Sequence, residues 1–124
     1  MEAKTNLVGL TKSFAIDAIL FNDKLQKDRR FTLSNQFSRS ATSIGANVFE
    51  ARFAESKKDF LHKMKIAEKE ANETGFWLDI LASTTDYEEV SVLQGDVIVI
   101  QKILSRSIQT IKRKLSEEQN TPQH

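Results

Sequence analysis

The chain has 124 residues, a length that suits one domain, and 40% of them are hydrophobic, which supports a core and excludes wholesale disorder. It contains no Cys, so disulfides, thiol catalysis and thiolate metal sites are excluded. The formal net charge of +1 is not that of a strongly basic nucleic-acid-binding domain.

Composition also favours helix, because the chain has one Pro, near its C-terminus, and only four Gly. The N-terminal stretch MEAKTNLVGL has no signal-peptide core. No apolar run approaches the roughly 20 residues needed to span a bilayer. We therefore expect an all-α, soluble protein of the cytoplasm.

Two helices are predicted in the first half of the chain. The first covers roughly residues 5–29, and Thr32 or Ser34 is expected to cap the second, which ends near Glu55. Each has one apolar stripe at helical spacing. The stripes are Leu7, Thr11, Phe14, Ala18, Phe21 and Leu25 in the first helix, and Phe37, Ala41, Ile44, Val48 and Ala51 in the second.

Two more helices follow, each preceded by a capping box. Ser56 with Asp59 opens the third helix, and Thr85 with Glu88 opens the fourth. Short connections predict antiparallel neighbours in an up-and-down four-helix bundle, one domain over residues 1–118 with a frayed tail at 119–124. The stripes are Phe60, Met64, Ala67, Ala71, Thr74, Leu78 and Leu81, and then Val90, Leu93, Val97, Ile100, Leu104, Ile108, Ile111 and Leu115.

The second helix has a second apolar line, 100–180° away from part of its core stripe by helical geometry. A peripheral helix of a monomeric bundle needs only one apolar face. One explanation is ordinary exposed apolar side chains, which are common. The other, which we prefer, is a self-association interface. Its candidate residues are Thr42, Ala46, Phe49 and Phe53.

A polar line runs beside the core stripe of the same helix, within RSATSIGANVFEA at residues 39–51. The third helix has a comparable polar shoulder. Such side chains either hydrogen-bond across helices or subunits and select one packing register, or are simply solvated. The candidates for the network are Arg39, Ser43, Asn47, Glu50, Glu70 and Glu73.

Three blocks of this sequence resemble the bacterial family of the 23S rRNA-intervening-sequence protein. The family pattern is approximately Q-x-x-R-S-x-x-S-I-x-A-N-I-x-E-A, then K-D-F, then E-x-x-E-T-x-x-W-L. Val48 departs from it by replacing an Ile. The resemblance is strong over residues 36–81 and extends to the first helix through its Phe and Leu pattern, whereas the fourth helix matches only in being amphipathic. The matching residues are Gln36, Arg39, Ser40, Ser43, Ile44, Ala46, Asn47, Glu50 and Ala51, then Lys58, Asp59 and Phe60, then Glu70, Glu73, Thr74, Trp77 and Leu78.

The resemblance implies an up-and-down four-helix bundle that assembles into a ring-shaped homopentamer. It also implies a likeness to the accessory protein of diversity-generating retroelements, which binds nucleic acid and a reverse transcriptase. The family has no established biochemical role, and the resemblance brings no catalytic residues.

The residues themselves favour a protein that is not an enzyme. Asp59 and His62 form one imperfect half of the Glu-x-x-His motif that holds two metals in some bundles, and the only other His is His124. No Gly-rich phosphate loop is present, and Ser40 and Ser43 have no His near them in sequence to act as a base. We therefore expect no catalytic residue, no metal and no cofactor.

Basic residues suggest a nucleic-acid contact, because residues 97–116 contain no Asp or Glu. The alternative is that these charges only complement the dipole of the fourth helix near its C-terminus. Two further basic pairs lie at the first and second connections, at opposite ends of an up-down bundle. The candidates are Lys102, Arg106, Arg113 and Lys114, together with Arg29, Arg30, Lys57 and Lys58.

These observations predict a homo-oligomeric bundle without catalytic activity. We expect it to bind RNA or DNA through repeated basic surfaces, as an accessory factor to a nucleic-acid-processing protein. The alternative is a protein–protein interaction scaffold that makes no direct contact with nucleic acid.

Overall fold

Four helices and short connections make up the computed structural model, which describes the backbone of residues 2–120 and the side chains of residues 7–120. The helices are α1 (Glu2–Lys27), α2 (Phe31–Ala51), α3 (Lys57–Thr84) and α4 (Glu89–Gln119). Between residues 2 and 120 the chain forms no strand, which confirms the all-α expectation. No helix in this range is long and apolar enough to cross a membrane.

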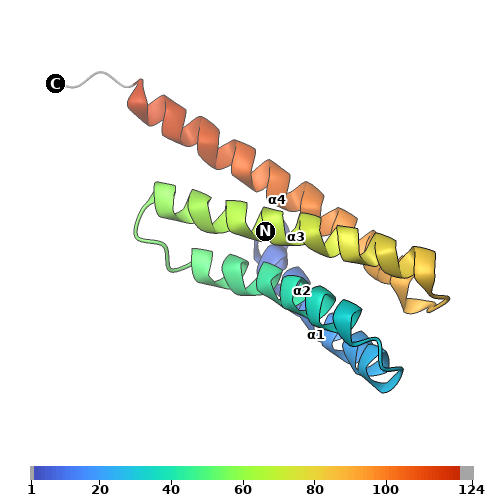
Figure 1. Ribbon diagram of the computed structural model, residues 1–124. Helices are drawn as coiled ribbons and strands as arrows, with labels where there is room; N and C mark the ends of the chain where they lie inside the picture. The colour runs from blue at the N-terminus through green and yellow to red at the C-terminus, as the bar shows by residue number, and fades with distance from the viewer. Residues whose placement is uncertain (1, 121–124) are drawn as a thin grey trace.

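Consecutive helices run antiparallel, and each packs on its neighbour in the chain (Figure 1). The α1–α2, α2–α3 and α3–α4 pairings are extensive, whereas the closing α1–α4 pairing is the least extensive of the four. In Figure 1 the C-terminal half of α4 diverges from the other helices and continues past the start of α3. The bundle is therefore closed tightly on three sides and loosely on the fourth.

The predicted stripes form the core almost without exception. All eleven residues predicted for α1 and α2 are buried, and so are Met64 to Leu81 in the α3 stripe and Val90 to Ile108 in the α4 stripe. Phe60, Ile111 and Leu115 are only half-buried. The two α4 residues lie on the diverging part of the helix, where fewer neighbours cover them.

Helix ends follow the predictions less closely. Ser56 does cap α3, since its side chain accepts a hydrogen bond from the Asp59 backbone N–H at 3.0 Å. The Thr85 prediction is wrong: Thr85 is the C-cap of α3, and its hydroxyl donates to the Leu81 carbonyl at 2.6 Å. Helix α4 starts after Glu88, without a side-chain cap.

The predicted cap of α2 is also wrong, because the helix begins at Phe31 without a side-chain cap. The helix ends at Ala51, before the predicted end near Glu55, so Phe53 lies in the connection to α3 and not on α2. Ser34 is fully buried and joins α2 to α1 instead. Its hydroxyl donates to Asn22 Oδ1 and accepts from Gln26 Nε2, each at 2.6 Å. A cross-helix partner has therefore taken the hydroxyl that the sequence suggested for local capping.

At Gly45 the backbone of α2 comes close to that of α1. A Cβ atom at this position would lie 3.1 Å from the carbonyl oxygen of Thr11 and 3.3 Å from its carbonyl carbon. The absence of a side chain thus sets how near the two backbones come. No pattern within α2 predicts this, because the constraint comes from α1.

Candidate nucleic-acid interface and contact surfaces

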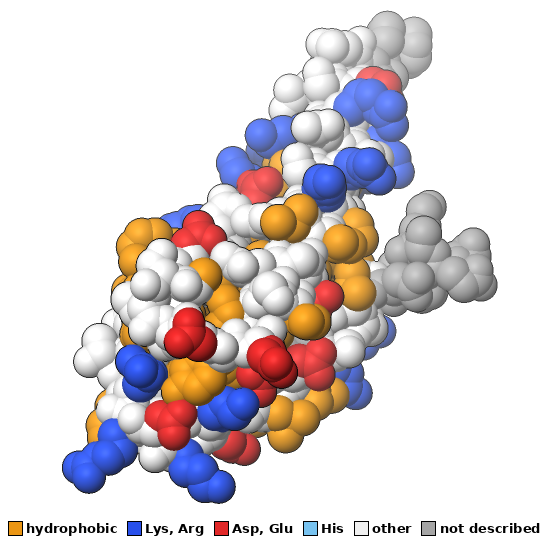
Figure 2. All heavy atoms as spheres, turned by 90° about the vertical axis from the view of Figure 1, so that its right-hand side faces the viewer, with side chains coloured by type: hydrophobic (Ala, Val, Ile, Leu, Met, Phe, Trp, Pro, Cys, Tyr) orange, Lys and Arg blue, Asp and Glu red, His pale blue; other side chains and the backbone are white. Residues whose placement is uncertain are grey.

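The strongest concentration of positive charge lies on the C-terminal half of α4. Figure 2 shows Lys and Arg side chains gathered along this projecting part of the molecule. Arg113 Nε lies 3.9 Å from Glu117 Oε2, but among the described residues no ion pair joins the other four cations to an acidic side chain. Five exposed cations form this set, the basic half of α4: Lys102, Arg106, Lys112, Arg113 and Lys114.

The basic residues at the second connection lie at the same end of the bundle. Lys57, at the first position of α3, forms an ion pair with Glu118 near the end of α4. Lys58 is exposed beside it in sequence. The fold therefore adds Lys58 to the neighbourhood of the basic half of α4, while the charge of Lys57 is already matched.

Arg29 and Arg30 lie at the opposite end, as the sequence predicted for the two connections. Arg29 has a left-handed backbone, with φ of 61°, in the turn that ends α1. Its N–H donates to the Gln26 carbonyl at 3.0 Å, and the Arg30 N–H donates to the Leu25 carbonyl at 2.9 Å. These two bonds are the Schellman pattern that closes a helix C-terminus.

Acidic and aromatic groups accompany the cations of that end. Arg30 Nε donates to the Tyr87 hydroxyl at 3.3 Å, and this hydroxyl in turn donates to Asp28 Oδ2. Lys24 Nζ is 2.8 Å from Glu89 Oε2. This hydrogen bond raises the pKa of Lys24 and lowers that of Glu89. Acidic groups thus lie among the cations of this end, with Lys24 paired to Glu89 and Arg30 linked through Tyr87 to Asp28, unlike in the basic half of α4.

The candidate self-association residues share an outward surface of α1 and α2. Phe49 and Phe53 are 49% and 68% exposed, and their ring centroids lie 5.6 Å apart. The Arg52 guanidinium lies over both rings, 4.6 and 5.4 Å from their centroids. Beside them is a shallow cavity of about 210 Å³ lined by Val8, Lys12, Ala15, Thr42, Gly45, Ala46 and Phe49.

The proposed polar network divides into a connected part and a local part. Arg39 on α2 reaches α3 by two ion pairs, with Glu70 at 3.3 Å and with Glu73. Trp77 Nε1 donates to Glu73 at 3.0 Å, and the hydrogen bonds from Arg39 and Trp77 lower the pKa of Glu73. This part joins α2 to α3 as a network between helices.

Ser43 and Asn47 belong to the local part. The Ser43 hydroxyl donates to the Arg39 carbonyl at 2.7 Å, and Asn47 Nδ2 donates to the Ser43 carbonyl at 2.9 Å, so both bond to the backbone of their own helix. Glu50 instead pairs with Lys63 on α3 at 2.8 Å. Within one chain, Ser43 and Asn47 do not bridge helices.

A buried hydroxyl pair that the sequence-based set omitted also joins α2 to α3. Thr74 Oγ1 donates to Ser40 Oγ at 2.9 Å, and both residues are fully buried. The sequence carried a signal for it, since Ser40 lies on the polar line and Thr74 on the core stripe of α3.

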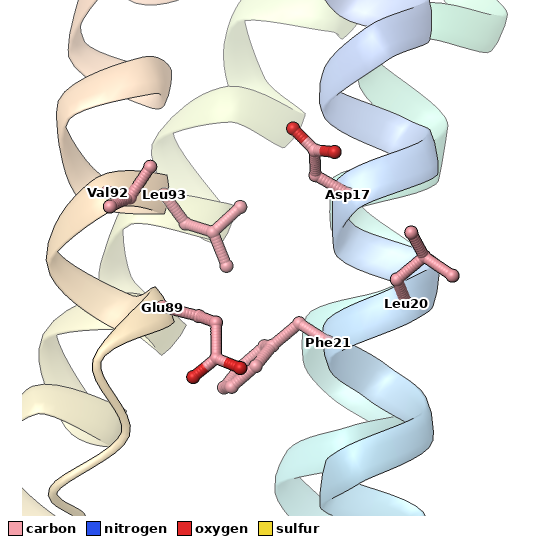
Figure 3. A pocket seen from close by; sticks show the side chains of 6 residues that line it. All are labelled: Asp17, Leu20, Phe21, Glu89, Val92 and Leu93. Atoms are coloured by element: carbon pink, nitrogen blue, oxygen red, sulfur yellow. The ribbon is translucent and has the colours of Figure 1, made fainter.

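The loosely packed side of the bundle contains a groove that sequence reasoning missed. Figure 3 shows it between α1 and α4, with Asp17 and Phe21 directed from α1 and Glu89 and Leu93 from α4. The cavity measures about 290 Å³. Its lining, which defines the α1–α4 groove, comprises Asp17, Leu20, Phe21, Glu89, Val92 and Leu93.

None of these surfaces, among the described residues, has the grouped ligands that a metal centre needs. In the part of the chain that the structure describes, no three His, Cys, Asp or Glu side chains are grouped so that they could hold a metal ion. His62 is an exposed residue of α3.

Comparison with known proteins identifies the family of this bundle. The sequence profile of the 23S rRNA-intervening sequence protein family matches residues 4–106, from α1 into the basic half of α4. The chain belongs to this family. Membership confirms the resemblance seen in α1 and in the α2 and α3 blocks, and the match extends it over much of α4.

One solved structure supports the membership in three dimensions. It is the crystal structure of a protein from Bacteroides thetaiotaomicron VPI-5482, described as a protein with unknown function from the S23 ribosomal protein family. The two sequences are 37% identical, the match covers 82% of this chain and 97% of the other, and the TM-score is 0.78. No curated protein is matched. The likeness to the retroelement accessory protein stays a prediction.

Proposed function

We propose that this family member is a self-associating bundle without catalytic activity that binds RNA or DNA through the basic half of α4. The observation that carries the proposal is the unbalanced charge on this part of the helix. It projects from the bundle, exposes five cations and contains no acidic residue before Glu117. At four of these five cations, all except Arg113, a phosphate backbone can approach without first displacing a carboxylate paired among the described residues.

Self-association supports the proposal by repeating the surface. Each Lys or Arg that neutralises a phosphate releases a condensed counterion, so affinity grows with the number of contacts and falls steeply with salt. One copy offers few contacts. A ring of copies, such as the homopentamer that the resemblance implies, presents them together and raises the apparent affinity without any new kind of contact.

Fluorescence polarisation with labelled single- and double-stranded RNA and DNA, over a salt series, tests the proposal. We expect micromolar or tighter binding that weakens as salt rises. Because Lys102 and Arg106 have no acidic partner among the described residues, their combined change to Glu should abolish most of it. The charge-matched control is Lys65→Glu with Lys69→Glu, two exposed cations of α3 outside the candidate set. Equal losses in both double variants would show only an effect of net charge.

A protein–protein scaffold is the second candidate function. The exposed apolar residues favour it, since Phe49, Phe53 and Phe76 are each about half exposed or more. Under this alternative the basic half of α4 serves to complement the negative C-terminal end of the helix dipole. Absence of any nucleic-acid binding at low salt, in protein of native helicity, would make the scaffold the better account.

A further inference from the structure

The α1–α4 groove has an apolar floor and apolar edges. Phe21 and Leu93, each 3% exposed, form the floor. Leu20 on α1 and Val92 on α4 are both 63% exposed at the edges. Apolar side chains on both sides of an unfilled cavity leave surface in contact with water that another apolar group would cover favourably. The groove is therefore suited to receive side chains from outside the bundle.

Besides Glu89, two carboxylates interrupt this apolar surface. Asp17 lines the groove, and Asp96 follows Val92 by one helical turn on α4. Burial, and secondly the negative charge of Asp17, raises the pKa of Asp96. Among the described residues, no cation forms an ion pair with Asp17 or Asp96. Lys24, near the groove, pairs with Glu89 instead. What the middle of the groove lacks is a positive charge.

The apolar surface resumes beyond the carboxylates. Leu10 lies two turns before Asp17 on α1, and Ile103 lies two turns after Asp96 on α4. Both are half-buried and pack against the core. Each edge thus follows the order apolar, carboxylate, apolar over about three helical turns. A second helix, with its own side chains repeating every three or four residues, matches such a surface.

We propose that the α1–α4 groove is a docking site for an amphipathic helix of a partner protein, which places one Lys or Arg between two apolar side chains. The apolar residues cover Leu20 and Val92 at one end and approach Ile103 at the other. The cation enters between Asp17 and Asp96. Nucleic acid is a poor occupant here, because its phosphates would meet Asp17, Asp96 and Glu89.

The inference deepens the scaffold function and does not depend on nucleic-acid binding. The groove and the basic half of α4 carry opposite charge. Variants of one surface are therefore expected to leave the other intact. Losing helix docking while retaining nucleic-acid binding, or the reverse, would separate the two proposals.

The probe is an Ala- and Gln-based peptide of about 18 residues, roughly five helical turns. It carries a Lys, with a Leu four residues before it and another seven residues after it. Two matched peptides replace the Lys by norleucine or by Glu. Binding to the full-length protein is measured by titration calorimetry at moderate salt. We expect the Lys peptide to bind at least about tenfold more tightly than the Glu peptide, with norleucine between them.

Protein variants then locate the site. Asp96→Asn should weaken binding of the Lys peptide several-fold while raising the melting temperature, since it removes a desolvated charge from the free bundle. Val92→Ser should weaken the binding of all three peptides. Asp23→Asn, an exposed carboxylate on α1 outside the groove, is the matched control and should change neither quantity.

Four outcomes would overturn the proposal. One is no binding by the Lys peptide; another is equal binding by the Lys and Glu peptides. The third is that Asp96→Asn or Val92→Ser lowers the mass of the protein itself in light scattering, which would show that a second copy covers the groove. The fourth is that Asp96→Asn and Val92→Ser keep both their helicity and their affinity for the Lys peptide, which would show that the groove is not the docking site.

Discussion

Replacing Phe53 by Glu tests the self-association surface most directly. A Phe side chain offers roughly 150–250 Å² of surface. With exposed fractions of 49% for Phe49 and 68% for Phe53, the pair leaves on the order of 200 Å² of apolar surface open. At about 25 cal/mol per Å², covering all of it contributes about 5 kcal/mol to a contact before ordering costs are subtracted. Phe53 accounts for about 3 kcal/mol of this, close to a hundredfold in the dissociation constant.

The expected result is a change in assembly without a change in fold. Because Phe53 is mostly exposed, the Glu variant loses few contacts within its own chain and should keep its helicity. Multi-angle light scattering at micromolar concentration should give several times 14.1 kDa for the unsubstituted protein. The Phe53→Glu variant should give a lower mass and a melting temperature that no longer depends on concentration.

Phe76→Glu is the matched control, since this α3 residue is 54% exposed and lies outside the surface shared by α1 and α2. It should leave the mass unchanged. The reasoning is refuted if the unsubstituted protein is itself a 14.1 kDa monomer, or if Phe53→Glu retains its mass.

Three further predictions concern stability. Gly45→Val should destabilise the bundle by about 1–3 kcal/mol in denaturant unfolding, because its added atoms meet the Thr11 backbone, and a stabilised variant would contradict this close approach. Glu73→Gln should lower stability at neutral pH, because Arg39 depresses the pKa of this carboxyl. Its contribution is present above the unfolded-state pKa and lost as pH falls through the folded pKa, so the two melting curves should converge in acid. The ionised Asp96 affects stability in the opposite direction to Glu73, because its raised pKa means that ionisation is unfavourable in the folded state. Asp96→Asn should therefore raise the melting temperature at neutral pH, with a gain that shrinks as pH falls; a gain independent of pH would point to a cause other than charge.

Helix ends and the candidate site show where local sequence patterns stop being informative. Ser34 and Thr85 both have the residue type of an N-cap, and neither acts as one. The Ser34 hydroxyl donates a hydrogen bond to Asn22 on α1, and the Thr85 hydroxyl donates one to a carbonyl of the preceding helix, α3. Ser56, which had no competing partner, caps α3 as predicted. A hydroxyl forms hydrogen bonds with whichever donor or acceptor the fold brings close to it, so its role depends on neighbours far away in sequence.

The sequence by itself determined the helices and their buried faces, because a repeat of three or four residues is a local property that survives in any packing. It also indicated Phe49 of α2, Phe53 just after that helix, and the acid-free half of α4, because these are facts of composition and spacing. The tertiary structure alone decided which charges are paired, since Lys57 and Lys24 meet their carboxylate partners only when the helices assemble. It alone brought Asp96 close to Asp17, which lines the α1–α4 groove, because the separation of α1 and α4 depends on how four side-chain layers fit together. Local periodicity specifies what a helix buries; the volumes of its neighbours specify what it leaves open.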